Sequence, residues 1–325
     1  MVRPVSIVVL VLVVSAAGNS FVWSQSCDSP CDRDACGPSD MYNAIWMVNA
    51  NAIALHRERP SGDVLFENAV QTSQNLQGSD FDFGYAAGFD LSLIRCLGAG
   101  QGVEVRYLKD DGWNSTTAVS TSDTDPLRIN TATPIFLPGG GTIDASYGSQ
   151  LDNLEINYRR TNEWLTSIVG FRYIELDERF DAGIDTTSAG LVSYDTTTQN
   201  RLYGIQLGVE ALLWEHAQWS IGAAAKAGIF HNSGSQNSEL ATNAFQSRAT
   251  GSEDKVAMLG EIGLTARYCL TENLSIRGGY GLLAIDGLVL ATDQVRESDF
   301  AYGTGIDGDG EVLYHGAFLG LEYLY

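Results

Sequence analysis

Charged residues of both signs recur at alternate positions along several segments of this chain. The clearest sets are Glu104 with Arg106, Glu155 with Arg159, and Glu261 with Arg267. Side chains an even number of residues apart share one face of a β-strand, and the planar guanidinium of arginine binds a carboxylate through two hydrogen bonds. These side chains are therefore placed to pair with one another across a sheet or to line a polar passage.

The other reactive residue types form no recognisable catalytic motif. Four histidines are present, His56, His216, His231 and His315, and nothing places two of them beside a particular serine. The chain has no Gly-x-Ser-x-Gly, no phosphate-binding loop and no His-Glu-x-x-His. His315 shares the apolar face of its segment, which favours a position at a membrane interface. We therefore expect no catalytic residues, no enzyme activity and no cofactor.

One short acidic segment offers ligands for a hard cation. Asp307, Asp309 and Glu311 alternate with glycines, and carboxylate oxygens are the ligands that calcium takes. The twelve-residue spacing of an EF-hand loop is absent, so an acidic turn is the favoured interpretation. We expect no metal site and keep these three residues as a weak calcium candidate.

The overall charge excludes one class of partner. The chain has 19 basic and 40 acidic residues, and phosphate binding requires clustered lysine and arginine. We therefore expect no nucleic acid partner. The acidity fits solvated loops or the attraction of cations.

The N-terminus has the pattern of an export signal. Arg3 precedes an almost uninterrupted apolar run over residues 5–14, and small residues follow at 15–18. This pattern predicts a secretory signal peptide over residues 1–25, and the apolar run is too short for a helical membrane span. We expect a cysteine-containing periplasmic segment over 26–40 and an outer-membrane β-barrel over 41–325.

Ten segments carry the alternation of apolar and polar residues that is typical of strands. They are 43–56, 81–95, 100–109, 151–160, 162–176, 201–214, 217–231, 255–269, 273–285 and 312–325. Most have at least the nine to eleven residues that a tilted membrane strand needs. The pattern predicts an all-β fold, a single antiparallel transmembrane β-barrel of about ten strands. Twelve become possible if 110–150 contains further strands.

The last segment ends the chain on an aromatic residue. One face of 312–325 is apolar and the other carries glycines and Glu322, as expected when one face meets lipid and the other the lumen. Leu319, Leu321, Tyr323 and Tyr325 form the expected C-terminal signal for the barrel assembly machinery.

Connection lengths alternate strictly between a few residues and about sixteen to forty. That arrangement predicts short periplasmic turns and long external loops. A two-residue turn at Thr161-Asn162 is expected to pair Tyr158 with Leu165. The long loops near 57–80, 110–150, 177–200, 232–254 and 286–311 are rich in small polar residues, and we expect them to be solvated and mobile. Residues 134–141 are expected in a plain external loop, with an inward constriction as the alternative.

The five cysteines fall on one side of this topology. Cys27, Cys31 and Cys36 precede the barrel, and Cys96 and Cys269 lie at short turns. An exported chain meets an oxidising compartment, so all five are disulfide candidates. The spacing of the first three, without a nearby histidine, is not a standard zinc pattern. The odd number leaves one thiol free or intermolecular.

The face opposite the apolar one is predicted to line the lumen. It carries Glu104, Arg106, Glu155, Arg159, Arg172, Glu210, Lys226, Glu261, Arg267, Arg277 and Glu322. Barrels near eight strands have an interior just wide enough for side chains to fill. We therefore expect these charges to pair and mostly fill the lumen, whereas a wider pore would use them to sort ions.

Some of these segments resemble the sequences of a known protein family. Residues 153–160, residues 170–178 and the glycine-rich strands through Tyr325 are similar to the putative β-barrel porin proteins frequent in Planctomycetes and to related Gram-negative outer-membrane families. The likeness covers about residue 81 to the C-terminus, although Tyr325 stands where phenylalanine is more usual. It implies a barrel in the outer membrane and a pore for small solutes or ions.

Three hypotheses follow for function. The first is an integral outer-membrane barrel with a structural or narrow-pore role, in contact with outer-membrane lipid. The second is a barrel scaffold whose acidic external loops bind or adhere. The third is a soluble periplasmic lipocalin-like binder, which would turn the apolar face inward around a ligand.

Overall fold

A computed structural model describes residues 46–122, 125–186, 188 and 190–325 of the 325-residue chain. The predicted signal peptide and the segment with Cys27, Cys31 and Cys36 lie outside these described residues.

The described residues are almost entirely strand. In chain order the elements are β1 (Trp46–Arg57), β2 (Val64–Asn68), β3 (Asn75–Gln77), a 3-10 turn (Gly78–Asp80), β4 (Tyr85–Gly98), β5 (Gln101–Asp110), β6 (Trp113–Ser120), β7 (Leu127–Ile129), β8 (Ile135–Leu137), β9 (Gly141–Asn162), β10 (Leu165–Thr186), β11 (Gly190–His216), β12 (Trp219–Ala241), β13 (Gln246–Cys269), β14 (Leu274–Leu288), α1 (Asp293–Glu297) and β15 (Gly310–Leu324). None of the described helices is long and apolar enough to span a membrane.

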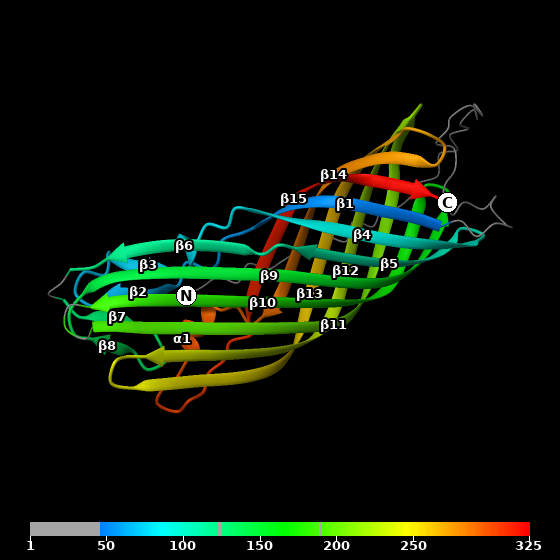
Figure 1. The fold of residues 1–325 in the computed structure, drawn as a ribbon. Helices are drawn as coiled ribbons and strands as arrows, with labels where there is room; N and C mark the ends of the chain where they lie inside the picture. Colours follow the sequence, from blue (N-terminus) through cyan, green and yellow to red (C-terminus); the bar gives the residue numbers. More distant parts are fainter. Residues whose placement is uncertain (1–45, 123–124, 187, 189) are drawn as a thin grey trace, which may run out of the picture.

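Ten antiparallel strands close into a ring in the described part of the chain. Neighbours follow the order β1, β4, β5, β9, β10, β11, β12, β13, β14, β15, and β15 pairs with β1 to complete the circle (Figure 1). The predicted all-β barrel of ten strands is confirmed, and each predicted segment overlaps one barrel strand. The extra strands within 110–150 exist, but they do not enlarge the ring. Instead, β6 pairs with the part of β9 that extends beyond β5.

The β9–β10 turn lies two residues later than predicted. Tyr158 faces Val169 instead of Leu165, and the turn residues are Glu163 and Trp164. Glu163 has a φ of 50°, a left-handed conformation that a tight turn requires. The register differs by four residues, an even number, so the apolar side chains of both strands still share one face.

Five consecutive strands are much longer than a membrane requires. β9 to β13 have 22 to 27 residues, whereas a tilted membrane strand needs about nine to eleven. Their surplus extends the wall well past the shorter strands (Figure 1). We call this extension, together with the connections that pack on it, the external lobe.

The external lobe has its own hydrophobic core, so the expectation of solvated, mobile loops is wrong. A four-stranded sheet in the order β3-β2-β7-β8 packs with α1 against the extended wall (Figure 1). Phe66 of β2 stacks on Phe180 of β10 at 6.2 Å and meets Tyr194 of β11 edge-on at 5.9 Å. All three are fully buried. Residues 134–141 are likewise no plain loop, because they contain β8 and Leu137 enters the core.

The outward face of the shorter, ring-forming part is a continuous apolar band. On β11 it consists of Tyr203, Ile205, Leu207 and Val209, each more than 40% exposed. A soluble protein does not expose apolar surface on this scale. Aromatic girdles bound the band, with Trp46, Trp164, Trp214 and Trp219 near the short turns and Tyr85, Tyr107, Tyr173 and Tyr280 toward the lobe. Apolar side chains therefore face lipid, and the soluble lipocalin-like alternative is wrong.

Candidate functional site

The lumen contains a network of ion pairs centred on Glu155. Its carboxylate lies 2.8 Å from Lys226 Nζ and 3.1 Å from Arg106 Nη1, and Arg172 Nη1 is 3.8 Å away. Gln206 donates a further hydrogen bond at 2.7 Å. The side chain of Glu155 is completely buried. Three cations and the amides of Gln206, Asn157 and Asn153 thus compensate a carboxylate that is completely buried.

Two further acids bind the same arginines. Glu261 accepts hydrogen bonds from Arg172 at 2.6 Å and from Arg106 at 2.9 Å. Asp90 accepts from Arg106 Nε at 2.8 Å. Each guanidinium therefore binds more than one carboxylate, which fixes its orientation across the lumen.

A second group continues the network toward the short turns. Arg159 binds Glu104 at 3.0 Å and also pairs with Glu210. Asn157 joins the two groups because its amide donates to both Glu104 and Glu155, at 3.1 Å in each case. The polar filling is continuous from β5 to β11.

A third group lies nearest the periplasmic end. Glu322 of β15 accepts from Arg267 at 3.0 Å, and Arg277 lies 3.9 Å away. Every charged residue predicted to line the lumen thus takes part in an ion pair. Asp82, which shares their parity in the sequence, lies outside the lumen and pairs with Arg59 at 2.7 Å.

The charges of the lumen balance. Among the described residues, six acids (Asp90, Glu104, Glu155, Glu210, Glu261 and Glu322) face six bases (Arg106, Arg159, Arg172, Lys226, Arg267 and Arg277). A neutral set of paired charges leaves little field to draw ions of one sign through the barrel. A cavity of about 380 Å³ remains among these side chains, bounded partly by Arg106, Glu261 and Tyr314.

Sequence reasoning missed the neutral polar residues of the lumen. Asn49 and Asn51 interrupt the apolar character of β1, and both are buried and face inward. Asn51 donates to Asp90 at 3.2 Å, and Asn49 donates to Ser92 at 2.8 Å. Both asparagines alternate with the outward-facing Val48 and Ala50, and this alternation already indicated that they face inward.

A buried cluster closes the external mouth of the barrel. Arg57, at the end of β1, reaches across to Glu178 of β10 at 2.5 Å and to the hydroxyl of Tyr147 of β9 at 3.2 Å. Trp113 packs on Tyr314 at 5.1 Å. All five side chains are at most 4% exposed. They link β1 and β15 to β9 and β10 on another part of the ring.

The connection after β14 packs on the same cluster. The backbone N–H of Ala291 donates to Glu178 at 2.9 Å, and Ser61 donates to Asp293 of α1 at 3.2 Å. Burial, assisted by the charge of Glu178, raises the pKa of Asp293 to about 7. This carboxyl group therefore titrates near neutrality, outside the membrane-spanning part.

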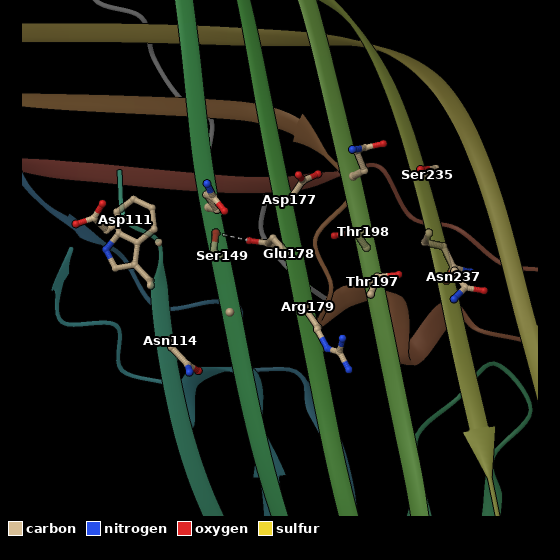
Figure 2. A pocket seen from close by; sticks show the side chains of 16 residues that line it. Asp111, Asn114, Ser149, Asp177, Glu178, Arg179, Thr197, Thr198, Ser235 and Asn237 are labelled. Atoms are coloured by element: carbon tan, nitrogen blue, oxygen red, sulfur yellow. Dashed lines mark hydrogen bonds between the residues drawn. The ribbon is translucent and has the colours of Figure 1, made fainter. Parts of the chain in front are cut away.

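A hollow of about 720 Å³ lies on the external lobe over β6, β9, β10, β11 and β12 (Figure 2). Amide and hydroxyl groups dominate its lining, which also includes three acids, Asp111, Asp177 and Glu178, and one base, Arg179. Figure 2 shows Arg179 beside Thr197 on the adjoining strand. The surface offers many neutral hydrogen-bonding groups and an excess of acidic over basic side chains.

The remaining predicted sites are placed as follows. Lys255 pairs with Asp309, and Arg296 lies 4.0 Å from Asp307, so these acids have basic partners. Within the described residues they do not join a cluster of potential metal ligands.

Cys96 and Cys269 are buried near the ends of β4 and β13, on the side of the short turns. Leu319, Leu321 and Tyr323 point outward in the apolar band, and Tyr325 exchanges backbone hydrogen bonds with Trp46.

Solved structures of outer-membrane proteins resemble this chain at low identity. The outer membrane protease OmpT from Escherichia coli has 13% identity and a TM-score of 0.45, with 87% of this chain and 97% of that chain covered. The toluene transporter TodX from P. putida has 10% identity and a TM-score of 0.32, with 89% and 92% covered. The translocator domain of the autotransporter NalP from Neisseria meningitidis has 8% identity and a TM-score of 0.41, with 87% and 89% covered.

Sequence comparison is more decisive. No curated protein matches the chain. A family model described as Putative beta barrel porin-7 (BBP7) matches residues 56–299, which is three quarters of the sequence and includes most of the barrel.

Proposed function

Since this chain belongs to the Putative beta barrel porin-7 family and is an outer-membrane β-barrel, we propose that it is a structural barrel with a closed lumen. In this role it anchors the folded external lobe at the cell surface. The observation that carries the proposal is the complete burial of Glu155 among three cations.

The energetics favour a closed lumen over an open pore. An ion crossing the barrel must separate buried charge pairs, which is unfavourable because each charge then loses the partner that compensates its desolvation. Beyond the network it meets the buried Arg57–Glu178 pair and then the aromatic core of the lobe. A narrow pore remains the competing role, since the cavity of about 380 Å³ lies on the path.

A second function, binding at the lobe, is favoured by the hollow in Figure 2. Its amides and hydroxyls suit an uncharged polar ligand, such as the sugar portion of a neighbouring lipid. The rigid wall of β9 to β12 would hold these groups in place, which lowers the entropic cost of binding. The binding element would then be the folded wall of the lobe, whereas the sequence suggested mobile acidic loops.

We extend the proposal to parts that the structure does not describe. The chain would be exported by a cleaved signal peptide over 1–25, and residues 26–40 would be fastened to the periplasmic turns by disulfides. Neither Cys96 nor Cys269 is a free thiol, which supports this arrangement. The last strand would be recognised by the barrel assembly machinery, and the protein would have no enzymatic activity.

Single-channel recording in planar bilayers tests the closed lumen. We expect the wild type to be silent, and discrete steps from a variant with Arg57→Ala, Glu178→Ala, Arg106→Ser and Glu261→Ser, which opens both the mouth and the network. Arg179→Ala with Asp181→Ala, on the outer face of the lobe, is the matched control and should stay silent. Heat-modifiable migration in detergent gels verifies folding of each variant.

Discrete steps from the wild type would overturn the closed lumen and favour the narrow pore. Deletion of 110–150 is unsuitable for this test, because it removes β6 and about half of β9.

A further inference from the structure

Barrel closure brings together three residues that are far apart in the sequence. His56 near the end of β1 pairs directly with His315 of β15, and their rings stack with centroids 5.0 Å apart. Glu58 follows β1 on the same side, and its carboxylate lies 3.3 Å from Nε2 of His315. One nitrogen or oxygen atom from each residue lies within 4.8 Å of the other two. In the described residues this is the one cluster with such potential ligands.

From this geometry we propose that His56, Glu58 and His315 bind a divalent transition-metal ion of the zinc class. Two imidazoles and one carboxylate are a ligand set that Zn²⁺ takes, with an open fourth position for water. In a tetrahedral site with bonds of about 2.0–2.1 Å, neighbouring ligand atoms lie about 3.3–3.4 Å apart. The separation between Glu58 and His315 already has this value.

A neighbouring tyrosine orients one of the ligands. The hydroxyl of Tyr280 lies 2.5 Å from Nδ1 of His315, which turns Nε2 toward Glu58. Metal-binding histidines commonly have their other ring nitrogen held in this way. When Nδ1 donates its hydrogen to Tyr280, Nε2 carries the lone pair that a metal needs.

His56 supplies an independent indication. Its Nδ1 atom is buried and has no hydrogen-bond partner among the residues that the structure describes, although buried polar atoms are nearly always satisfied. Tyr85 packs edge-on against the ring at 5.4 Å and restricts its rotation. An imidazole nitrogen that lacks a hydrogen-bond partner is available to bind a cation.

The position of the cluster indicates what the ion would do. His56 and His315 lie toward the lobe end of the outward faces of β1 and β15, at the aromatic girdle nearest the lobe, and half of the Glu58 side chain is exposed. The site is therefore reachable from the external water. It lies where the first and last barrel strands pair, so a bound ion would cross-link β1 to β15 and stabilise the pairing that closes the ring.

Metal binding by the refolded, chelator-treated chain in detergent tests the proposal. With ZnCl₂ as the probe, we expect calorimetry and elemental analysis to give one ion per chain. His315→Gln and Glu58→Gln should each lower the affinity at least about tenfold, and His56→Gln with His315→Gln should abolish binding. Tyr280→Phe should lower it about tenfold, as expected for a residue that orients a ligand.

The chain provides a matched control. His231 also lies at the external edge of the band, with Asp254 3.7 Å away, but that pair offers only two ligands. His231→Gln should leave Zn²⁺ binding unchanged. With CoCl₂ as a second probe, the wild type should show the visible absorption of a four-coordinate site, and the double variant should not.

Two results would overturn the metal site. The first is the absence of stoichiometric Zn²⁺ binding by wild-type protein that shows heat-modifiable migration. The second is equal binding by the wild type and the double histidine variant. In either case His56, His315 and the tyrosines serve only as interfacial aromatic residues.

Discussion

The inner face of β10 carries Arg172 within the membrane-spanning barrel and Phe180 in the external lobe. Both side chains are buried, and they point to the same side of the same strand. The outer face changes in the opposite sense, from Phe171 in the apolar band to Arg179 in the lobe. The strand is thus polar inside and apolar outside in one half, and apolar inside and polar outside in the other.

The medium around the wall explains this inversion. Within the membrane the outer face meets lipid, so apolar side chains gain nothing by turning inward, and the interior can hold paired charges. Beyond the membrane the outer face meets water, and the hydrophobic effect requires apolar side chains to be buried inside. Electrostatic pairing therefore organises the lumen, and hydrophobic packing organises the lobe.

The largest effect is expected when Glu155, at the centre of the ion-pair network in the lumen, is removed. Glu155→Leu leaves Arg106, Arg172 and Lys226 facing one another without their shared carboxylate. We expect the free energy of unfolding to fall by about 3–5 kcal/mol, measured by denaturant unfolding in lipid vesicles with tryptophan fluorescence. Adding Lys226→Met should restore part of the loss. Unchanged unfolding of the single variant would show that the lumen is hydrated and the pairs are weak.

Truncation of an aromatic ring should test the hydrophobic half. Phe180 contacts the rings of Phe66, Phe81, Tyr147 and Tyr194, and Phe180→Ala should destabilise the lobe by about 3–5 kcal/mol. Limited proteolysis should cut the lobe faster while the barrel keeps its heat-modifiable migration. Phe171→Ala, on the lipid face of the same strand, should leave the proteolysis rate unchanged. Simultaneous loss of both regions would contradict their independence.

Acidification should stabilise the lobe. The pKa of Asp293 is raised to about 7 by burial, above the value near 3.9 of an unfolded chain. Between pH 4 and 7 the folded state therefore binds more protons, so this group's contribution to stability falls as pH rises, by at most about 1.4 kcal/mol per unit. Proteolysis of the lobe at a series of pH values measures the slope. Asp293→Asn should reduce that slope, and an identical pH profile would refute the assignment.

The smallest effect is expected on the outer face of the lobe. Arg179 pairs with Asp181 at 2.7 Å, but its side chain is 65% exposed. Pairs of this kind contribute about 0–1 kcal/mol, so Arg179→Ala should barely change proteolysis or unfolding. A loss comparable to that of Phe180→Ala would mean that the lobe depends on surface charge.

Much of the barrel could be predicted from local pattern. Strand positions, outward faces and the alternation of short and long connections follow from the two-residue period, which each segment displays by itself. The lobe could not be predicted in this way. In the lobe, the long strands have polar outer faces and inner faces that mix apolar and polar residues, so the alternation is weak. In addition, β2, β7 and β8 have only three to five residues each. Such short segments become strands because they pack on a wall contributed by distant parts of the chain.

The candidate site residues can likewise be divided into those that the sequence predicts and those that only the fold brings together. The sequence by itself determined which charged residues turn away from lipid, because parity along a strand decides that. Only the tertiary structure decided their partners, such as Glu155 with Lys226, since strand stagger and side-chain reach across the ring select them. It also decided that Arg57 pairs with Glu178 and that His56 meets His315. Closure of the ring joins residues at opposite ends of the chain, a contact that no local pattern encodes.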